Sequence, residues 1–436
     1  MNPGFSLLPQ SCVVFVLAGG RGARLHELTA HDCKPAISFA GSCRIIDFSL
    51  GNIVNSDLKT ALVATQYQPA RLLSHIRSRW RACFARHGGS IECLSSGGGS
   101  ETCGYKGTAD AVLKNIAHID GHAPRHVLVV AADHIYQMNY ADMLETHVAT
   151  GADVTIATDV VARRSAKGFG VVAANSRGRI VGFAEKPAEP AGLPDDPEKS
   201  LASMGIYVFD WLLLRRMLIE DAADERSSHD FGSDILPKLI ARGNAFVHRF
   251  TAPGDRSRRG YWRDVGTLDA LHAANMDLLV GGADEPLDLA NWPLHVGWIG
   301  ERAGLGGRAD AVSLVYPGSG HQGASVAHSV IGPLASAGPG CRIDRSILMP
   351  GARISGNVSL KNVIVAPDVV ISDPLVVGED PEEDAVWFRR TDAGVVLIDQ
   401  AMADRRAEAR KLAKGWRAVT SNNLATPVLT KSSQAG

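Results

Sequence analysis

Apolar and polar residues follow two different patterns in the two halves of this chain. In the first half, short apolar runs such as Val13 to Leu17 and Val127 to Ala131 alternate with longer amphipathic stretches. The apolar positions of residues 46–54, 72–80 and 143–148 recur at the spacing of a helix. Strands that alternate with helices in this way predict a mainly parallel sheet with helices on both faces.

A hairpin is expected to add antiparallel strands to this core. Gly170 to Ala174 and Ile180 to Glu185 flank the sequence Asn175-Ser176-Arg177-Gly178, which is typical of a turn. A single helix opened by Thr108 is expected to include Val112, Ile116 and Ile119. The predicted fold class of this half is therefore α/β, with a Rossmann-like mixed sheet that is mainly parallel.

The second half lacks helical spacing until its end. Between Leu348 and Val370, apolar residues recur at every sixth position, which is the period of a hexapeptide left-handed β-helix. An antiparallel sheet whose alternation matches this period by chance remains an alternative. The two interlocked registers are Leu348/Ile354/Leu360/Ala366 and Ala352/Val358/Ile364/Val370.

These patterns divide the chain into four parts. We expect an α/β domain at residues 1–290 and a linker rich in Gly, Pro and Ser at 291–320. The C-terminal β-helix follows at 321–375, and a charged helix with a polar tail occupies 376–436.

Composition narrows the possible partners. The 436 residues carry 45 Lys and Arg against 46 Asp and Glu, so no overall field attracts nucleic acid or an anionic membrane. No basic residues precede the first apolar run, and that run is too short to span a bilayer, so we expect a cytoplasmic protein. The seven cysteines form no CxxC pair and are expected to be reduced thiols.

A glycine-rich loop follows the first predicted strand. Its sequence, Ala18-Gly19-Gly20-Arg21-Gly22-Ala23-Arg24-Leu25, lets backbone amides approach a polyphosphate while Arg24 supplies positive charge. Lys34 lies close enough in sequence to meet the same anion. The loop matches neither the GxGxxG dinucleotide motif nor the Walker A motif. A simple strand-to-helix turn with a solvated arginine, and a surface role for Lys34, remain alternatives.

Two aspartates are candidate metal ligands. Asp133 follows a predicted parallel strand, at the edge where open α/β sheets bind ligands. With Asp264 and substrate phosphates it would form a site suited to Mg²⁺. Each aspartate also has a structural alternative, because Asp133 could cap a helix and Asp264 could pair with an arginine.

Glu185 and Lys186 suggest a sugar phosphate site. A carboxylate can accept hydrogen bonds from sugar hydroxyls, and an ammonium group can hold a phosphate oxygen. Solvation of an exposed Glu-Lys-Pro turn is the alternative.

The motifs occur together in the order found in one family. The strings LAGGRGARL, KPA, RIIDF, ATQYQ, GTADA, DHIY, GFGVV, EKPA, LASMGIYVFD, SSHDFG and YWRDVGT resemble those of ADP-glucose pyrophosphorylases, the glucose-1-phosphate adenylyltransferases of glycogen and starch synthesis. This resemblance covers nearly the whole chain. It implies a nucleotidyltransferase domain that transfers the adenylyl group of ATP to glucose 1-phosphate, and it implies a homotetramer.

The resemblance also implies roles for individual residues. Arg24 and Lys34 would hold the triphosphate of ATP, Asp133 and Asp264 would hold magnesium, and Lys186 would hold the sugar phosphate. Tyr105, Gly107 and Gly170 would lie near the nucleotide and the bound sugar. The glucose pocket would be lined by Glu185, Ser203, Tyr207, Asp230, Phe231 and Trp262.

The sequence departs from the family at positions linked to regulation. Many bacterial members carry a basic pair before KPA, where this chain has His31 and Asp32, and Pro367 replaces another basic contact. An anionic effector could instead meet Arg405, Arg406, Arg410 and Lys411, although a solvated helix face is the favoured interpretation. Three other functions remain open: a non-catalytic regulatory subunit, a nucleotidyltransferase for another base or sugar, and a bifunctional acyltransferase.

Overall fold

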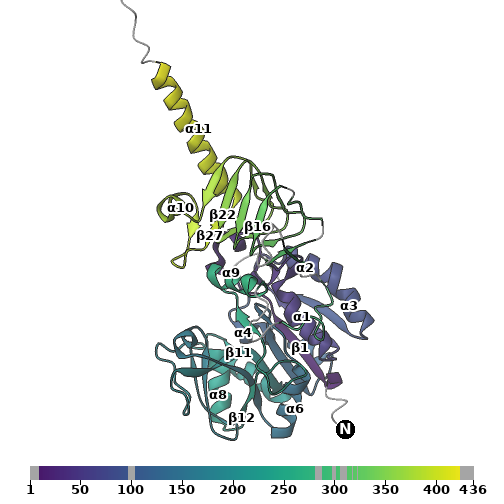
Figure 1. Ribbon diagram of the computed structural model, residues 1–436. Helices are drawn as coiled ribbons and strands as arrows, with labels where there is room; N and C mark the ends of the chain where they lie inside the picture. Colours follow the sequence, from purple (N-terminus) through teal and green to yellow (C-terminus); the bar gives the residue numbers. More distant parts are fainter. Residues whose placement is uncertain are drawn as a thin grey trace, which may run out of the picture. The chain divides into compact units, whose positions relative to one another are not determined.

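The computed structural model describes residues 9–96, 104–279, 287–296, 301–304, 312–316, 318–321 and 323–422. It divides the chain into two compact units, Met1–Ile299 and Gly300–Gly436. Figure 1 shows the ribbon of both units.

A nine-stranded sheet forms the centre of the first unit. Its main path runs in the order β10-β9-β11-β6-β1-β4-β5, and β8 joins β11 to β12. The pairs β6-β1, β1-β4, β4-β5 and β8-β12 are parallel, whereas β11 is antiparallel to β6, β8 and β9. The predicted mixed, mainly parallel sheet is confirmed. The strands are β1 (Cys12–Leu17), β4 (Thr60–Thr65), β5 (Ser90–Ser95), β6 (His126–Ala131), β8 (Val154–Ala162), β9 (Gly170–Ala174), β10 (Ile180–Glu185), β11 (Lys199–Asp210) and β12 (Ala245–Arg249).

Both faces of this sheet are buried, and alternate residues of one strand show it. Val14 and Val16 of β1 belong to one hydrophobic cluster, whereas Val13 and Phe15 belong to another. The first cluster includes residues of α1 (Ile45–Asn55), α2 (Ala70–His75), η5 (Ile76–Trp80), α3 (Arg81–Arg86) and α6 (Tyr140–Thr150). The second includes residues of α4 (Thr108–Leu113), α5 (Ile116–Asp120), α7 (Trp211–Ala222), η8 (Phe231–Ile235) and α8 (Leu236–Ala241).

The hairpin is confirmed, but the helix expected from Thr108 is two helices. Strands β9 and β10 pair antiparallel, with Phe183 opposite Val172. Helix α4 ends at Leu113, and α5 begins at Ile116 after Asn115 leaves helical geometry with φ −113° and ψ 17°. The side-chain amide of Asn115 donates to the Ala111 carbonyl and to the Tyr105 hydroxyl, which stabilises the break.

A small sheet follows the carboxyl end of β6. Strand β7 (His134–Tyr136) pairs antiparallel with β13 (Trp262–Asp264), which precedes α9 (Leu268–Asp277). Asp264 lies opposite His134 in this pairing. Residues about 130 positions apart in sequence are thus fixed side by side.

The second unit is a β-helix of parallel strands. Ser325 pairs with Arg342, Arg342 with Ser359, and Ser359 with Val376, so one coil takes 17 residues. Its three faces are β15-β17-β20-β23-β27, β16-β19-β22-β25 and β18-β21-β24, the first of which also carries β14 and β26 at its ends. This parallel arrangement is consistent with the predicted left-handed β-helix. The strands are β14 (Glu301–Gly304), β15 (Val312–Val315), β16 (Ser325–Ala327), β17 (Val330–Ile331), β18 (Ser336–Ala337), β19 (Arg342–Asp344), β20 (Ile347–Leu348), β21 (Arg353–Ile354), β22 (Val358–Lys361), β23 (Val363–Val365), β24 (Val370–Ile371), β25 (Leu375–Val377), β26 (Arg389–Arg390) and β27 (Val396–Ile398).

All positions of the two predicted apolar registers are buried in the β-helix except Val370, the last position of the second register. Val370 is 42% exposed, and its neighbour Ile371 is buried. The reason is the coil length, because a step of 17 residues from the buried Ile354 leads to Ile371, whereas a strict period of six leads to Val370. Strands β14 and β15 lie within residues 291–320, the range expected to be a linker.

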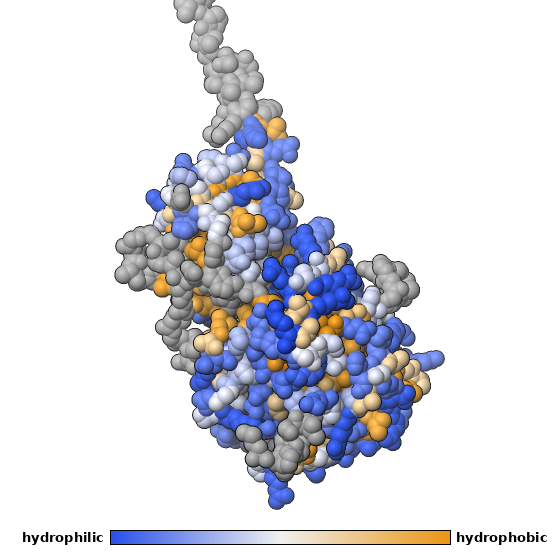
Figure 2. Space-filling view, turned by 90° about the vertical axis from the view of Figure 1, so that its right-hand side faces the viewer, coloured by the Kyte–Doolittle hydropathy of each residue, from blue (hydrophilic) through white to orange (hydrophobic). Residues whose placement is uncertain are grey.

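Two helices complete the second unit. Helix α10 (Pro381–Trp387) begins at Asp380, whose carboxylate accepts from the backbone amides of Glu382 and Glu383. Helix α11 (Gln400–Asn422), drawn in yellow in Figure 1, follows β27 directly. None of the helices in the described ranges is long and apolar enough to cross a bilayer. On the face seen in Figure 2, hydrophilic residues cover most of the surface.

Candidate active site

The glycine-rich loop leads from β1 into a short 3-10 helix, η3 (Ala23–Thr29). Gly22 has φ 63°, and a Cβ atom there would lie 2.9 Å from the Cβ of Lys34. The Thr29 hydroxyl donates to the Gly22 carbonyl at 3.0 Å and fixes this close approach. The loop therefore lies directly against Lys34, and the Arg24 side chain beyond it is 71% exposed.

Lys34 lies between the two predicted metal carboxylates. Its Nζ atom is 3.1 Å from Oδ2 of Asp133 and 2.8 Å from Oδ1 of Asp264. The lysine side chain is only 5% exposed, whereas those of Asp133 and Asp264 are 34% and 22% exposed. Both carboxylates thus have a face open to a ligand, while the lysine is enclosed.

The charges of this group stabilise one another. Burial opposes the charged form of Lys34, but Asp133 and Asp264 raise its pKa above the ordinary value. Burial likewise opposes ionisation of Asp133, but His134 and Lys34 lower its pKa to about 2. Asp133 is therefore a carboxylate, and Lys34 an ammonium, at neutral pH.

His134 and Trp262 support the carboxylates from the β7-β13 sheet. The His134 Nε2 atom lies 3.6 Å from Asp133 and 3.7 Å from Asp264. Its ring packs edge-on against Trp262 with centroids 5.5 Å apart, and Phe169 packs on Trp262 at 5.0 Å. Trp262 is buried, and its Nε1 atom has no hydrogen-bond partner within the described part of the chain. An open cavity of about 840 Å³ borders Phe169, Trp262 and Asp264.

Glu185 ends strand β10, Lys186 follows it, and two glycines lie beside the Glu185 carboxylate. The Lys186 Nζ atom lies 3.1 Å from Oε1 of Glu185, and its backbone amide donates to the Phe169 carbonyl. A Cβ atom at Gly170 would lie 3.0 Å from Oε2 of Glu185, and one at Gly232 would lie 2.5 Å from it. These two glycines make room for the Glu185 carboxylate. Gly232 was missed at sequence level, although it ends the SSHDFG string.

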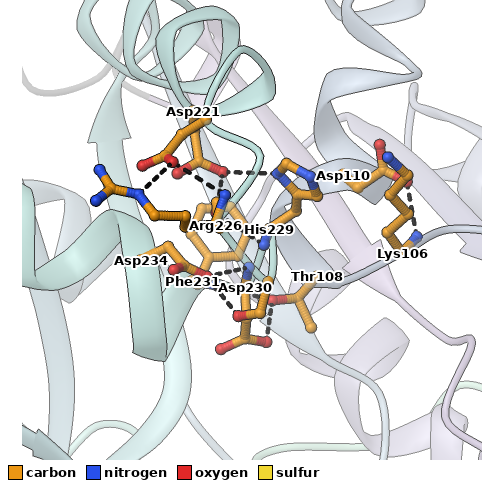
Figure 3. A network of polar contacts seen from close by, with 12 residues as sticks. Lys106, Thr108, Asp110, Asp221, Arg226, His229, Asp230, Phe231 and Asp234 are labelled. Atoms are coloured by element: carbon orange, nitrogen blue, oxygen red, sulfur yellow. Dashed lines mark hydrogen bonds and ion pairs between the residues drawn. The ribbon is translucent and has the colours of Figure 1, made fainter.

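Asp230 organises the segment that carries Phe231, as Figure 3 shows. Its Oδ1 atom accepts from the backbone amides of Gly232 and Ser233, and its Oδ2 atom accepts from the Thr108 hydroxyl at 2.8 Å. The same hydroxyl accepts from the Phe231 amide at 2.9 Å. Asp230 is thereby the cap of η8, and both its oxygens are engaged within the protein.

Ser203 and Tyr207 meet across a bulge in β11. The Ser203 hydroxyl donates to the Tyr207 hydroxyl at 3.4 Å, and the pairing of β11 with β8 shifts register between them. The Tyr207 ring packs 5.9 Å from that of Phe231, and burial raises the pKa of its phenol. Tyr207 is therefore a neutral hydroxyl in an aromatic cluster.

Gly107 and Tyr105 occupy the segment before α4. A Cβ atom at Gly107 would lie 2.3 Å from the His229 carbonyl, so a larger residue would push the two segments apart. The Tyr105 amide donates to the Gln66 side chain at 3.2 Å. A Cβ atom at Gly104 would lie 2.3 Å from Nε2 of the same Gln66.

Most of the predicted site residues thus form two groups, whereas Tyr105 and Gly107 lie in the segment before α4. One holds Arg24, Lys34, Asp133 and Asp264. The other holds Glu185, Lys186, Gly170 and, through Gly232, the Asp230-Phe231 segment with Tyr207 and Ser203. Trp262 and Phe169 lie between them, because Trp262 packs on His134 and Phe169 accepts from Lys186.

Besides Gly232, three contributors were not identified as site residues from the sequence: Phe169, His134 and the Thr108 hydroxyl. Their local motifs, GFGVV, DHIY and GTADA, carried the resemblance, but their contacts arise only from the fold. The spacing of residues within each motif does not indicate these contacts.

Comparison with known proteins agrees with this architecture. Residues 13–280 match the family model of nucleotidyl transferases, and residues 301–398 match that of the GlmU-like C-terminal hexapeptide. The first unit therefore belongs to the nucleotidyl transferase family.

Comparison with individual proteins indicates a narrower family than the two family models do. A glucose-1-phosphate adenylyltransferase of Jannaschia sp. is 42% identical over 415 residues, covering 92% of this chain and 99% of that protein. Proteins of the same name from Granulibacter bethesdensis and Rhizobium meliloti are 43% and 41% identical, covering 92% and 91% of this chain and 99% and 97% of their own. The chain belongs to the family of glucose-1-phosphate adenylyltransferases.

Proposed function

We propose that this protein transfers the adenylyl group of ATP to α-D-glucose 1-phosphate and releases ADP-glucose and pyrophosphate, the committed step of glycogen synthesis. The family membership supports the reaction class and the substrates. The observation that carries the proposal is the buried Lys34 ammonium between Asp133 and Asp264, directly beside the glycine-rich loop.

The donor set of this group fits magnesium. Mg²⁺ prefers carboxylate oxygens and is commonly bound by one or two carboxylates together with substrate phosphates. Asp133 and Asp264 supply two such carboxylates, each partly exposed, and the low pKa of Asp133 keeps it deprotonated. Bound there, magnesium would supply positive charge that polarises the phosphates and stabilises the leaving group. The described residues contain no cluster of three or more His, Cys, Asp or Glu suited to a metal, so substrate oxygens would complete the coordination.

The reaction needs positioning and charge neutralisation more than covalent chemistry. An oxygen of the glucose 1-phosphate monoester attacks the α-phosphorus of ATP, a new O–P bond forms, and the bond from that phosphorus to the bridging oxygen of pyrophosphate breaks. Arg24 and the backbone amides of the glycine-rich loop would hold the triphosphate, while Lys34 would neutralise charge as pyrophosphate leaves. Tyr105 and Gly107 would lie along the nucleotide.

The second group would bind the sugar phosphate. Lys186 is exposed and has positive φ at 42°, so its side chain is presented by a turn and is available to a phosphate. The Glu185 carboxylate would accept hydrogen bonds from sugar hydroxyls. It fits in its position because Gly170 and Gly232 have no side chain that would collide with it. Ser203, Tyr207, Asp230, Phe231 and Trp262 would complete the pocket.

Assembly, regulation and localisation remain predictions. A homotetramer, an anionic metabolite effector and a cytoplasmic location are expected from the resemblance and the composition. The domain limits at residues 290, 320 and 375 are likewise predictions.

Pyrophosphate release from the purified protein tests the reaction. The assay contains magnesium and glucose 1-phosphate and compares ATP with UTP and dTTP, with and without sugar phosphates and keto acids. We expect a clear preference for ATP. A preference for another nucleotide would replace the adenylyl assignment, and no release under every condition would favour a non-catalytic regulatory subunit.

A further inference from the structure

A single hydroxyl group joins the segment that opens α4 to the segment that opens η8. Thr108 donates to Oδ2 of Asp230 at 2.8 Å and accepts from the Phe231 amide at 2.9 Å. Figure 3 shows Thr108 against these two residues. The donor and an acceptor site of the hydroxyl are thus both used between two segments that lie 122 positions apart in sequence.

The backbone beside Thr108 makes the same connection. The amides of Ala109 and Asp110 donate to the His229 carbonyl at 2.9 and 3.3 Å. Amides at the start of a helix have no acceptor within that helix, and here the other segment supplies one. The two backbones are in direct contact at Gly107, where a Cβ atom would lie 2.6 Å from the Ser228 carbonyl oxygen.

His229 has a backbone conformation that its neighbours must maintain. Its φ is 56°, in the left-handed region that residues other than glycine seldom adopt. Its ring Nδ1 atom lies 3.1 Å from Oδ2 of Asp221, whose side chain is 2% exposed, and its amide donates to the Ser227 hydroxyl at 2.9 Å. Such conformations persist where surrounding contacts determine them, and they are found at ligand clamps. The segment 227–231 is therefore held in place by Asp221 and by the start of α4.

This junction lies between residues proposed to bind different substrates. Tyr105 and Gly107, proposed to lie along the nucleotide, come just before Thr108 in the chain. Asp230 and Phe231, proposed to line the glucose pocket, are the two partners of its hydroxyl. A ligand that orders one of these segments also restricts the other, so a second ligand has less conformational freedom left to remove.

We propose that Thr108 is a positioning residue that couples the binding of ATP to the binding of glucose 1-phosphate. The inference rests on the proposed function, because it takes both substrates from it. Thr108 acts through its partners, since both of its hydrogen bonds are made to protein atoms. Each substrate should tighten the binding of the other by the same factor, because linkage between two binding equilibria is reciprocal.

Isothermal titration of the full-length protein in the presence of magnesium measures this coupling. The ligands are glucose 1-phosphate and α,β-methylene ATP, whose carbon bridge prevents transfer of the adenylyl group. We expect the unmodified protein to bind glucose 1-phosphate at least about fivefold more tightly when the analogue is saturating. Thr108→Val keeps the shape of the side chain without the hydroxyl, and its two dissociation constants should agree within about twofold.

Three further variants separate this role from a general loss of structure. Thr108→Ser retains the hydroxyl and should retain the coupling factor. Thr108→Ala removes the hydroxyl without a methyl group in its place, so it provides a second test if the valine variant is unstable. Thr146→Val is the matched control, because the Thr146 hydroxyl bonds to the Asp142 carbonyl within α6 and lies 2.9 Å from His248, outside both groups of site residues.

The outcomes distinguish this inference from the proposed function. If the unmodified protein binds neither ligand, the proposed function is wrong and the role of Thr108 falls with it. If it binds both ligands but neither tightens the other, or if Thr108→Val and Thr108→Ala keep the full factor, only the role of Thr108 is wrong. An equal loss of coupling in Thr146→Val would likewise overturn it, because any loosening of the fold would then suffice.

Discussion

Lys34 illustrates how single residues in this site depend on one another. Its ammonium group is buried, and Asp133 and Asp264 raise its pKa, while His134 and Lys34 lower the pKa of the Asp133 carboxyl. The sequence predicted Lys34 as a ligand for a triphosphate but not as the bridge between the aspartates. Lys34 is separated in sequence from Asp133 by 99 positions and from Asp264 by 230 positions, so local spacing cannot reveal that the three side chains meet.

Replacing Asp133 should therefore affect turnover more than binding. Asp133→Asn keeps the size of the side chain but removes the negative charge that would hold magnesium. We expect kcat to fall by a factor on the order of 10², with little change in KM for either substrate. Steady-state kinetics measures this, with the exposed Asp57→Asn as the control. A raised KM at unchanged kcat would contradict the assigned role.

Replacing Lys186 should have the opposite pattern. A lysine that holds the phosphate of glucose 1-phosphate binds the ground state and the transition state alike. Lys186→Ala should raise KM for glucose 1-phosphate by a factor on the order of 10² and leave kcat and KM for ATP nearly unchanged. Lys59→Ala is the control, because the Lys59 side chain is 32% exposed and precedes β4 at the amino end of that strand. A kcat effect without a KM effect would assign Lys186 to the chemical step instead.

At the scale of elements, the strands were easier to predict than the helices around the site. The β-branched runs of β1, β6 and β8 and the turn between β9 and β10 are local signals, and the structure has them. The break between α4 and α5 and the irregular helix η8 depend on side chains that bond outside their own segment, such as Asn115 to Tyr105 and Asp230 to Thr108. In the β-helix, the 17-residue coil could not be deduced from a period of six, which misplaced Val370.

The cap of η8 links stability to sugar binding. Asp230→Ala removes the acceptor for two backbone amides and for Thr108, which should lower the free energy of unfolding by about 2 kcal/mol. It should also raise KM for glucose 1-phosphate, because Phe231 and Gly232 lose their support. Thermal or chemical unfolding and kinetics test the two effects separately.

Asp210→Ala provides the control for this experiment. Asp210 caps α7 by accepting from the Leu213 amide at 3.0 Å, and it lies opposite His126 at the far end of β6 from Asp133. The Asp210→Ala substitution should lower the free energy of unfolding by about 1 kcal/mol, as the loss of one capping bond implies, but should leave KM unchanged. Equal kinetic effects in both variants would show that Asp230 acts only through stability.

At the scale of the whole molecule, composition and pattern predicted the two-part architecture because each unit has its own repeat. The central sheet alternates strand and helix, and the β-helix repeats one coil, so both signals persist over many residues. The site is less predictable, since it joins segments from residue 22 to residue 266 that only the folded sheet brings together. The site residues could still be proposed from the sequence, because their motifs occur in the order found in a known family.

The first unit should lose stability in mild acid because it buries neutral histidines. Burial lowers the pKa of His147 to about 3 and also lowers that of His126, whose ring lies 5.1 Å from it. Unfolded His titrates near 6.5, so below that pH the unfolded state binds more protons than the folded state. Stability is therefore complete above about pH 6.5 and falls as the pH decreases toward the folded-state values. At pH 5.5, His147 alone should cost about 1.4 kcal/mol.

Denaturant unfolding at pH 7.5 and 5.5, observed by a signal from the first unit, measures this loss. His147→Gln can keep the hydrogen bond to Thr155 without a titrating group, so it should reduce the difference between the two pH values by about 1.4 kcal/mol. His118→Gln changes a half-exposed histidine that pairs with Glu92 and should leave the difference nearly unchanged. If His147→Gln retains the full pH dependence, the acid sensitivity arises from other groups, such as the carboxylates around Lys34.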